Sequence, residues 1–179
     1  MSDRRNDRDV VGLLEPLRRY ALSLTRDPAD AEDLVHDALV RAMERRDQFK
    51  AGHSLRPWLM SILHNRFVDK ARARRTEAVH HADLAIREAS GLPGDQEGVV
   101  RLADVRRFFT MLPDEQRAAL HLVTVEGLSY EEAAGALAIP VGTLVSRLSR
   151  ARARLRELEE GGPADNVVNF RTKAGPDAL

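Results

Sequence analysis

The chain has 179 residues, with 28 Lys and Arg against 28 Asp and Glu, no cysteine and only 4% aromatic residues. The lack of cysteine excludes a disulfide framework and a thiolate metal site. No apolar run approaches the roughly 18 residues of a membrane helix, and the charged start MSDRRNDRD does not resemble a secretory signal. We therefore expect a cytoplasmic protein, and abundant Leu and Ala favour helices over strands.

Apolar residues at helical spacing predict three helices in the first part of the chain, after an N-terminal tail of residues 1–9. The first begins at Val10 and ends at Asp27–Pro28. The second begins near Asp30 and reaches about Phe49. The third opens near Arg56–Pro57, because proline is tolerated in the first turn of a helix. Together these helices can enclose one small core over residues 10–76.

Helical periodicity weakens over residues 77–100, where Gly91, Pro93 and Gly94 predict a flexible linker. It returns at Leu102, and further helices are predicted for 114–126, 129–138 and 141–158. Residues 159–179 are expected to form a disordered tail. The predicted fold is therefore all-α, with two small helical domains, 10–76 and 101–158, joined by the linker.

The predicted helix 141–158 combines an apolar side with a neighbouring polar side. At about 100° per residue, the polar sector holds Thr143, Ser146, Arg147, Arg150 and Arg154. Upstream, the sequence GLSYEEAAGALAIP predicts a short helix and a tight connection, which together give a helix-turn-helix. The second helix of this motif enters the major groove, where arginine can bind guanine. A solvated surface helix is the alternative.

A second basic segment lies in the third predicted helix and contains Arg66, Lys70, Arg72, Arg74 and Arg75, interleaved with Asn65 and Asp69. Cations stabilise a helix C-terminus, but that accounts for one or two of them and not for the whole run. Binding of phosphates accounts for the run, because each neutralised phosphate releases counterions. Asn65 and Asp69 lie one turn apart, as contacts to an exposed base require.

An acidic stretch separates the first two predicted helices and continues into the second, with no Lys or Arg among residues 27–37. Part of this charge is explained by helix capping. Because DNA would repel the remainder, we expect a protein partner with a basic surface. The face that would meet this partner carries Glu32, Asp33, His36 and Asp37.

Three segments taken together resemble the extracytoplasmic-function sigma factors of bacterial RNA polymerase. They are DPADAEDLVHDALVRAMERRDQF, LRPWLMSILHNRFVDKARARR and LPDEQRAALHLVTVEGLSYEEAAGALAIPVGTLVSRLSRARARLR, and the resemblance covers about residues 10–158. It implies an alternative sigma factor that binds core polymerase, recognises the minus-ten and minus-thirty-five promoter elements, and acts in a stress or envelope response under an anti-sigma factor.

The resemblance also assigns residues to these roles. The second helix is expected to bind the clamp helices of the largest polymerase subunit through Glu32, Asp33, His36, Asp37 and Arg41. Minus-ten recognition, with capture of an unstacked base, is expected of Asn65, Arg66, Asp69, Lys70, Arg72, Arg74 and Arg75. Minus-thirty-five recognition is expected of Gly142, Thr143, Ser146, Arg147, Arg150 and Arg154. Pro140 stands where the family commonly has a small polar residue.

Two other interpretations are compatible with the residues. One is a repressor or activator that binds an operator as a dimer through the helix-turn-helix, with residues 10–75 as a sensing or dimerisation domain. The other is an adaptor that makes only protein contacts. An enzyme is not expected, because the chain has no phosphate loop, zincin motif or nucleophile elbow, and neither a cofactor nor a metal is predicted. Binding to core polymerase and to DNA distinguishes the three.

Overall fold

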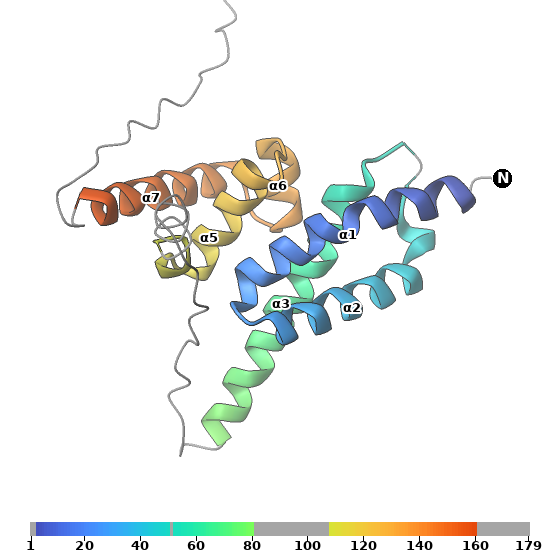
Figure 1. Ribbon diagram of the computed structural model, residues 1–179, viewed down its shortest axis with the longest axis horizontal. Coiled ribbons are helices and arrows are strands. Elements are labelled where there is room, and N and C mark those ends of the chain that lie inside the picture. The colour runs from blue at the N-terminus through green and yellow to red at the C-terminus, as the bar shows by residue number, and fades with distance from the viewer. Residues whose placement is uncertain (1–2, 51, 81–107, 161–179) are drawn as a thin grey trace, which may run out of the picture.

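The computed structural model describes residues 3–50, 52–80 and 108–160, and the secondary structure of these residues is helical (Figure 1). The N-terminal part contains α1 (Asp3–Thr25), α2 (Pro28–Glu44), the short 3-10 helix η1 (Arg46–Gln48) and α3 (Leu55–His80). The C-terminal part contains α5 (Asp114–Leu120), the π-helix η2 (His121–Val125), α6 (Tyr130–Ala136) and α7 (Val141–Glu160). The expected all-α fold is confirmed.

The helices α1, α2 and α3 pack into one bundle, which we call the N-terminal bundle. Its core is built from buried residues of all three helices, namely Leu17, Tyr20, Ala21, Leu24, Leu34, Val35, Ala38, Leu59, Met60 and Leu63. The α1–α2 turn is fixed by Asp27, whose side chain accepts a 2.9 Å hydrogen bond from the Asp30 backbone N–H, with Pro28 in the first turn.

The boundaries of these helices differ from the predicted ones. Helix α1 begins at Asp3, within the predicted tail of residues 1–9, because no proline or glycine interrupts the charged start. Helix α2 ends at Glu44, where the chain tightens into η1 before Phe49. Helix α3 continues to His80 and so takes in the first residues of the predicted linker. The remainder of that linker and most of the predicted tail 159–179 lie outside the described residues.

The C-terminal part, which we call the C-terminal unit, contains the expected helix-turn-helix. Ser129 and Glu132 form a capping box at the start of α6: the Ser129 side chain accepts from the Glu132 N–H, and the Glu132 carboxylate accepts from the Ser129 N–H. A turn through Ala138 then leads to α7, whose Leu144, Leu148 and Ala151 are buried. One long helix was predicted over 114–126, whereas the structure changes from α to π at His121.

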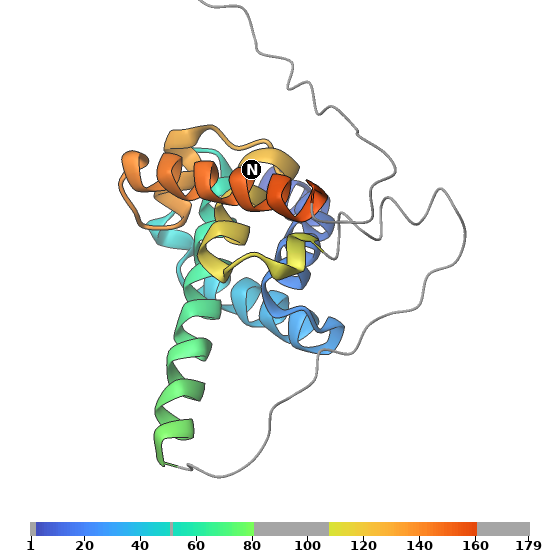
Figure 2. The ribbon, with the colours of Figure 1, turned by 90° about the vertical axis from the view of Figure 1, so that its left-hand side faces the viewer.

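The two halves of the chain pack against each other. Helix α1 contacts α5 and η2, and α3 contacts α6. Figure 2 shows the C-terminal unit lying across the upper part of the N-terminal bundle, with the second half of α3 extending away from it. The flexible connection that the sequence predicts is therefore compatible with direct contact between the two helical regions.

One residue in the turn of the helix-turn-helix, Ala138, has a strained backbone conformation. Ala138 has φ of 52°, in the left-handed region, which costs an L-residue roughly 1–2 kcal/mol. We expect Ala138→Gly to raise the free energy of unfolding by about 0.5–1 kcal/mol, since the greater freedom of glycine in the unfolded chain offsets part of the gain. Urea denaturation measures the change. Ala136→Gly, in the last turn of α6, is the matched control and should destabilise by about 1 kcal/mol.

Candidate nucleic-acid and polymerase interfaces

Helix α7 presents its polar side much as its periodicity predicts. Thr143, Arg150 and Arg154 are exposed and Ser146 is half-buried, while Gly142 lies exposed in the first turn. Arg150 donates a 2.7 Å hydrogen bond to the Ser146 hydroxyl, so these two side chains form one polar surface. A surface that combines hydroxyl and guanidinium donors fits phosphates and the edges of bases.

Arg147 differs from the other arginines of this set because it is turned toward the rest of the protein. Its guanidinium forms a 2.8 Å ion pair with Glu115 of α5, and its side chain is only 18% exposed. It also lies close enough to His64 of α3 to act on that ring: burial, reinforced by the charge of Arg147, lowers the pKa of His64 to about 4. Arg147 can therefore contact DNA only if this arrangement changes.

On α3, the residues expected to recognise the minus-ten element fall into two groups. Asn65, Asp69 and Arg72 are exposed, with no ion pair among the described residues. Arg66, Lys70 and Arg74 instead pair with acidic residues of α2: Arg66 and Lys70 both reach Asp37, at 3.4 and 2.8 Å, and Arg74 reaches Asp30 at 3.2 Å. The side chain of Arg75 lies outside the described part of the structure.

Ion pairs occupy some residues of the acidic face expected on α2 and leave others available. The hydrogen bond from Lys70 lowers the pKa of Asp37, and the charge of Arg66 adds to this effect. Glu32 pairs with Arg18 of α1, and Arg41 pairs with Glu44. Asp33 and His36 are exposed and have no charged partner among the described residues. These two residues are therefore the most available for a partner protein.

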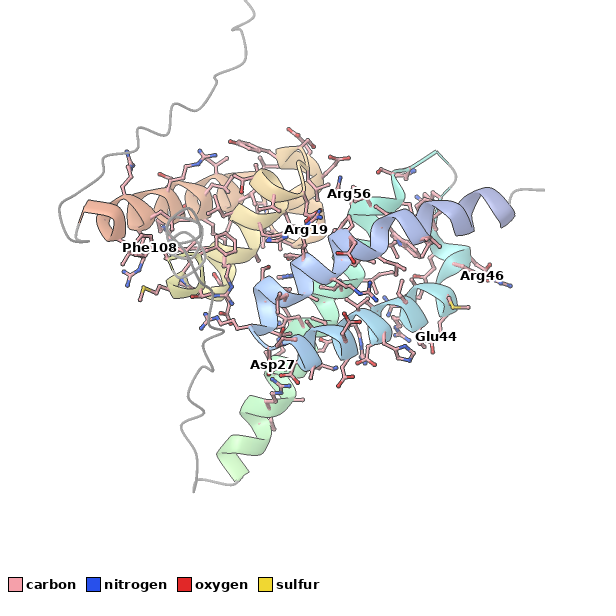
Figure 3. The ribbon with its side chains drawn as sticks, in the orientation of Figure 1. Arg19, Asp27, Glu44, Arg46, Arg56 and Phe108 are labelled. Carbon is pink, nitrogen blue, oxygen red and sulfur yellow. The ribbon has the colours of Figure 1, made fainter. Side chains whose placement is uncertain are left out.

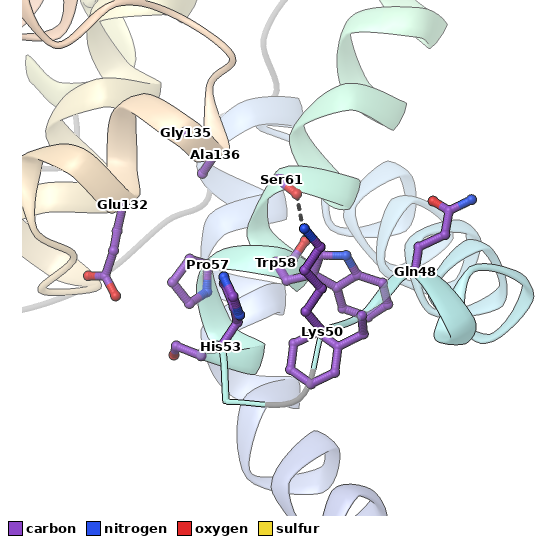
Figure 4. A pocket seen from close by; sticks show the side chains of 11 residues that line it. Gln48, Lys50, His53, Pro57, Trp58, Ser61, Glu132, Gly135 and Ala136 are labelled. Atoms are coloured by element: carbon purple, nitrogen blue, oxygen red, sulfur yellow. Dashed lines mark hydrogen bonds between the residues drawn. The ribbon is translucent and has the colours of Figure 1, made fainter.

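An open pocket of about 470 Å³ lies beside the start of α3 (Figure 4). Its lining from the N-terminal bundle includes the rings of Phe49 and Trp58, whose centroids are 5.1 Å apart, and Lys50 and His53. Aromatic rings beside a cation provide the chemistry that binds unstacked bases. On the opposite side the pocket is lined by Glu132, Gly135 and Ala136 of α6. Trp58 is partly buried against the core and also lines this pocket.

The junction of the two halves holds a buried polar cluster that the sequence analysis did not identify. The carboxylate of Glu126, a residue only 2% exposed, lies 3.3 Å from Arg19 of α1, binds Arg56 of α3, and lies 3.1 Å from Nε2 of His121. Figure 3 shows the side chains of Arg19 and Arg56 at this junction. Burial raises the pKa of Glu126, but hydrogen bonds from His121 and Arg56 outweigh it, so the pKa lies below its ordinary value.

A buried cation, Arg117 of α5, also joins the halves, through backbone groups of α1. It is fully buried and donates hydrogen bonds to the carbonyls of Ser23 and Leu24 at the end of α1, and to the carbonyl of Leu112. Its guanidinium also pairs with Asp114 at 2.7 Å. The sequence signal that could have indicated this junction is the presence of two charged residues, Arg117 and Glu126, beside the apolar residues of the predicted helix 114–126.

No helix in residues 3–50, 52–80 and 108–160 has the length and apolar character needed to cross a membrane. The same residues contain no group of three or more His, Cys, Asp or Glu arranged to hold a metal ion.

Comparison with known proteins agrees with this architecture. Residues 10–77 match the model for Sigma-70 region 2, and residues 102–155 match Sigma-70, region 4. The ECF RNA polymerase sigma factor EcfG of Rhodopseudomonas palustris is 37% identical over 165 residues, which cover 89% of this chain and 91% of that protein. The sigma factor RpoE of Bartonella quintana, solved in complex with the anti-sigma factor NepR, superposes with a TM-score of 0.77 at 36% identity, covering 91% of this chain and all of that one.

A structure of CnrH in complex with the cytosolic domain of CnrY is also similar, with a TM-score of 0.66 at 26% identity over 90% of this chain and 91% of that one. The matched regions coincide with the two helical parts of the structure, and the relatives align along nearly the whole chain. The chain therefore belongs to the extracytoplasmic-function (ECF) sigma factors of the sigma-70 family, which are transcription initiation factors rather than enzymes.

Proposed function

We propose that this chain binds core RNA polymerase in the cytoplasm and directs it to promoters that carry its own minus-ten and minus-thirty-five elements. The observation that supports this most is the separation of three surfaces on the fold. An exposed face of α2 bears Asp33 and His36, α3 bears Asn65 and Asp69 beside a run of cations, and α7 is a basic second helix of a helix-turn-helix.

Each surface suits one task. The α2 face is acidic and suits a basic polymerase surface such as the clamp helices of the largest subunit, with Glu32, Asp37 and Arg41 at its margins. The exposed edge of α3 and the pocket lined by Phe49 and Trp58 suit a base that leaves the stack as the duplex opens. The exposed residues of α7 suit the major groove of the minus-thirty-five element. The linker between the two DNA-binding parts would follow the polymerase surface.

We further propose that an anti-sigma factor controls this chain, with release in a stress or envelope response. Support comes from two of the similar structures, which are complexes of a sigma factor with an anti-sigma factor and of CnrH with the cytosolic domain of CnrY. The promoter sequence and the inducing signal are to be found by sequencing the transcripts that the reconstituted holoenzyme produces.

In vitro transcription with core polymerase tests the proposal, and Asp33→Lys locates the docking face. We expect promoter-specific transcripts from the wild-type chain. The reversed charge on α2 should weaken binding to core polymerase by about 10-fold, since a like charge opposite a basic partner is repelled. Asp47→Lys, on the exposed 3-10 helix η1, is the matched control. A chain that binds an operator as a dimer but never binds core polymerase would contradict the proposal.

A further inference from the structure

The packed arrangement of the two halves is incompatible with simultaneous recognition of two promoter elements. By their names, the minus-ten and minus-thirty-five elements lie about 25 base pairs apart, or about 85 Å at ~3.4 Å per base pair. In this structure α6 of the helix-turn-helix packs directly against α3, the helix that carries Asn65, and α7 packs on α6. Even the whole of α3, at ~1.5 Å per residue, is about 39 Å long. The two halves must therefore separate before both elements are bound.

The packed arrangement also obstructs nucleic acid at the pocket beside the start of α3. The pocket beside Trp58 has Glu132 of α6 on one side, and a carboxylate at that place repels a phosphate. The contact between the halves thus limits access to the pocket, and their separation would remove this carboxylate from it. The ion pair of Arg147 with Glu115 lies within the C-terminal unit and does not depend on the contact between the halves.

Several polar contacts join the halves, among them Arg117 with the carbonyls of α1 and Asp114 with Arg26, but the buried carboxylate that binds two cations of the opposite half is Glu126. Glu126 belongs to the C-terminal unit, and its oxygens contact Arg19 and Arg56, which both belong to the N-terminal bundle. Its own unit supplies His121, which the π-helix brings next to it: the Glu126 N–H bonds the His121 carbonyl at 3.0 Å, five residues back, so the two side chains lie on one side. Without this carboxylate, two guanidinium groups would meet at the junction with no anion between them.

We propose that Glu126 is an interdomain latch, which holds the two DNA-binding halves together in the free protein and must release Arg19 and Arg56 before promoter recognition. The effect of the latch on promoter recognition rests on the proposed function. The first test of the latch does not, because it uses the free chain alone. The latch gives Glu126 a regulatory role that is separate from the contacts to polymerase and to DNA.

Distance measurement on the free protein tests the latch directly. The chain contains no cysteine, so Met43→Cys on α2 and Ser149→Cys on α7, both exposed, provide two unique sites for spin labels or fluorophores. We expect one short distance in the otherwise wild-type chain, and a broad, longer distribution after Glu126→Gln. Glu15→Gln removes an exposed carboxylate that pairs with Arg18 within α1, and it is the matched control that should leave the distance unchanged.

A second variant covers the case in which Glu126→Gln does not fold. Arg19→Glu changes a side chain that is 49% exposed and places a second carboxylate against Glu126. It should open the halves while the helical circular dichroism stays at the wild-type level. A short, unchanged distance in folded Arg19→Glu would overturn the latch, and so would a long distance in the wild-type background.

The consequence for function is measured separately with core polymerase. If the halves must part to form the holoenzyme, a variant that is already open avoids that cost and should bind core polymerase more tightly. We expect a gain of about 5- to 150-fold, the range of typical conformational coupling. An opened chain with unchanged or weaker affinity would overturn the proposed coupling to promoter recognition. Failure of the wild-type chain to bind polymerase at all would instead contradict the proposed function and leave the distance result intact.

Discussion

Replacement of Arg117 by methionine should lower the free energy of unfolding by about 3–5 kcal/mol, because three backbone carbonyls lose the buried donor that satisfies them. Arg117 is fully buried and caps the end of α1, where the last carbonyls of a helix have no partner within it. Its positive charge also lies at the negative end of the α1 dipole. Methionine fills much of the same space but donates no hydrogen bond, so the carbonyls of Ser23, Leu24 and Leu112 lose this donor.

Urea denaturation followed by circular dichroism measures this loss, which is a large part of the roughly 5–15 kcal/mol that stabilises a typical domain. Arg46→Met is the matched control, because Arg46 is exposed on η1 and should change the value by no more than about 0.5 kcal/mol. Arg117→Lys should fall between the two, since lysine keeps the charge but lacks the planar fork of donors. A stability equal to the wild type for Arg117→Met would show that the carbonyls find other partners.

Replacement of Arg147 by alanine should reduce transcription from the native promoter by about 10- to 100-fold, within the range for loss of one bidentate contact to a base. The loss should depend on the minus-thirty-five sequence and should disappear on promoters in which that element does not contribute. Affinity for core polymerase should stay at the wild-type level, because the α2 face is unchanged. Transcription and polymerase binding are measured in parallel on the same preparations.

Two controls separate DNA contact from a structural role of Arg147. Arg152→Ala removes an exposed arginine from another side of α7 and should have a small effect. Glu115→Gln removes the ion-pair partner of Arg147 but leaves the arginine in place. If Glu115→Gln reproduces the whole loss, the ion pair and not the contact to DNA is what matters. If it preserves or raises transcription, Arg147 acts on the promoter.

The helices could be predicted from the sequence because their signals are local. The Asp27–Pro28 turn and the Ser129–Glu132 capping box each depend on residues a few positions apart, and the structure has both. The apolar side of α7 follows from periodicity alone, and Leu144, Leu148 and Ala151 are indeed buried. The division into two helical regions followed from the loss of periodicity after residue 76.

The candidate site was less predictable because its arrangement depends on contacts between residues distant in sequence. The pairing of Asp37 with Lys70, and of Glu126 with Arg19 and Arg56, leaves no periodic signal. The π-helix at His121 gives none either, since a single turn of five residues is too short to establish a period of its own. The roles assigned to individual residues on α2, α3 and α7 remain predictions.

The bridge from Asp37 to Lys70 and Arg66 connects the helix proposed to meet the polymerase with the helix proposed to meet the promoter. A carboxylate has a limited number of acceptor positions, so a cation from a docking protein competes with these two residues for the same oxygens. When that competitor prevails, α3 regains positive charge on the side proposed to face phosphates. Attachment of a large partner would in this way strengthen the attraction of the neighbouring helix for nucleic acid.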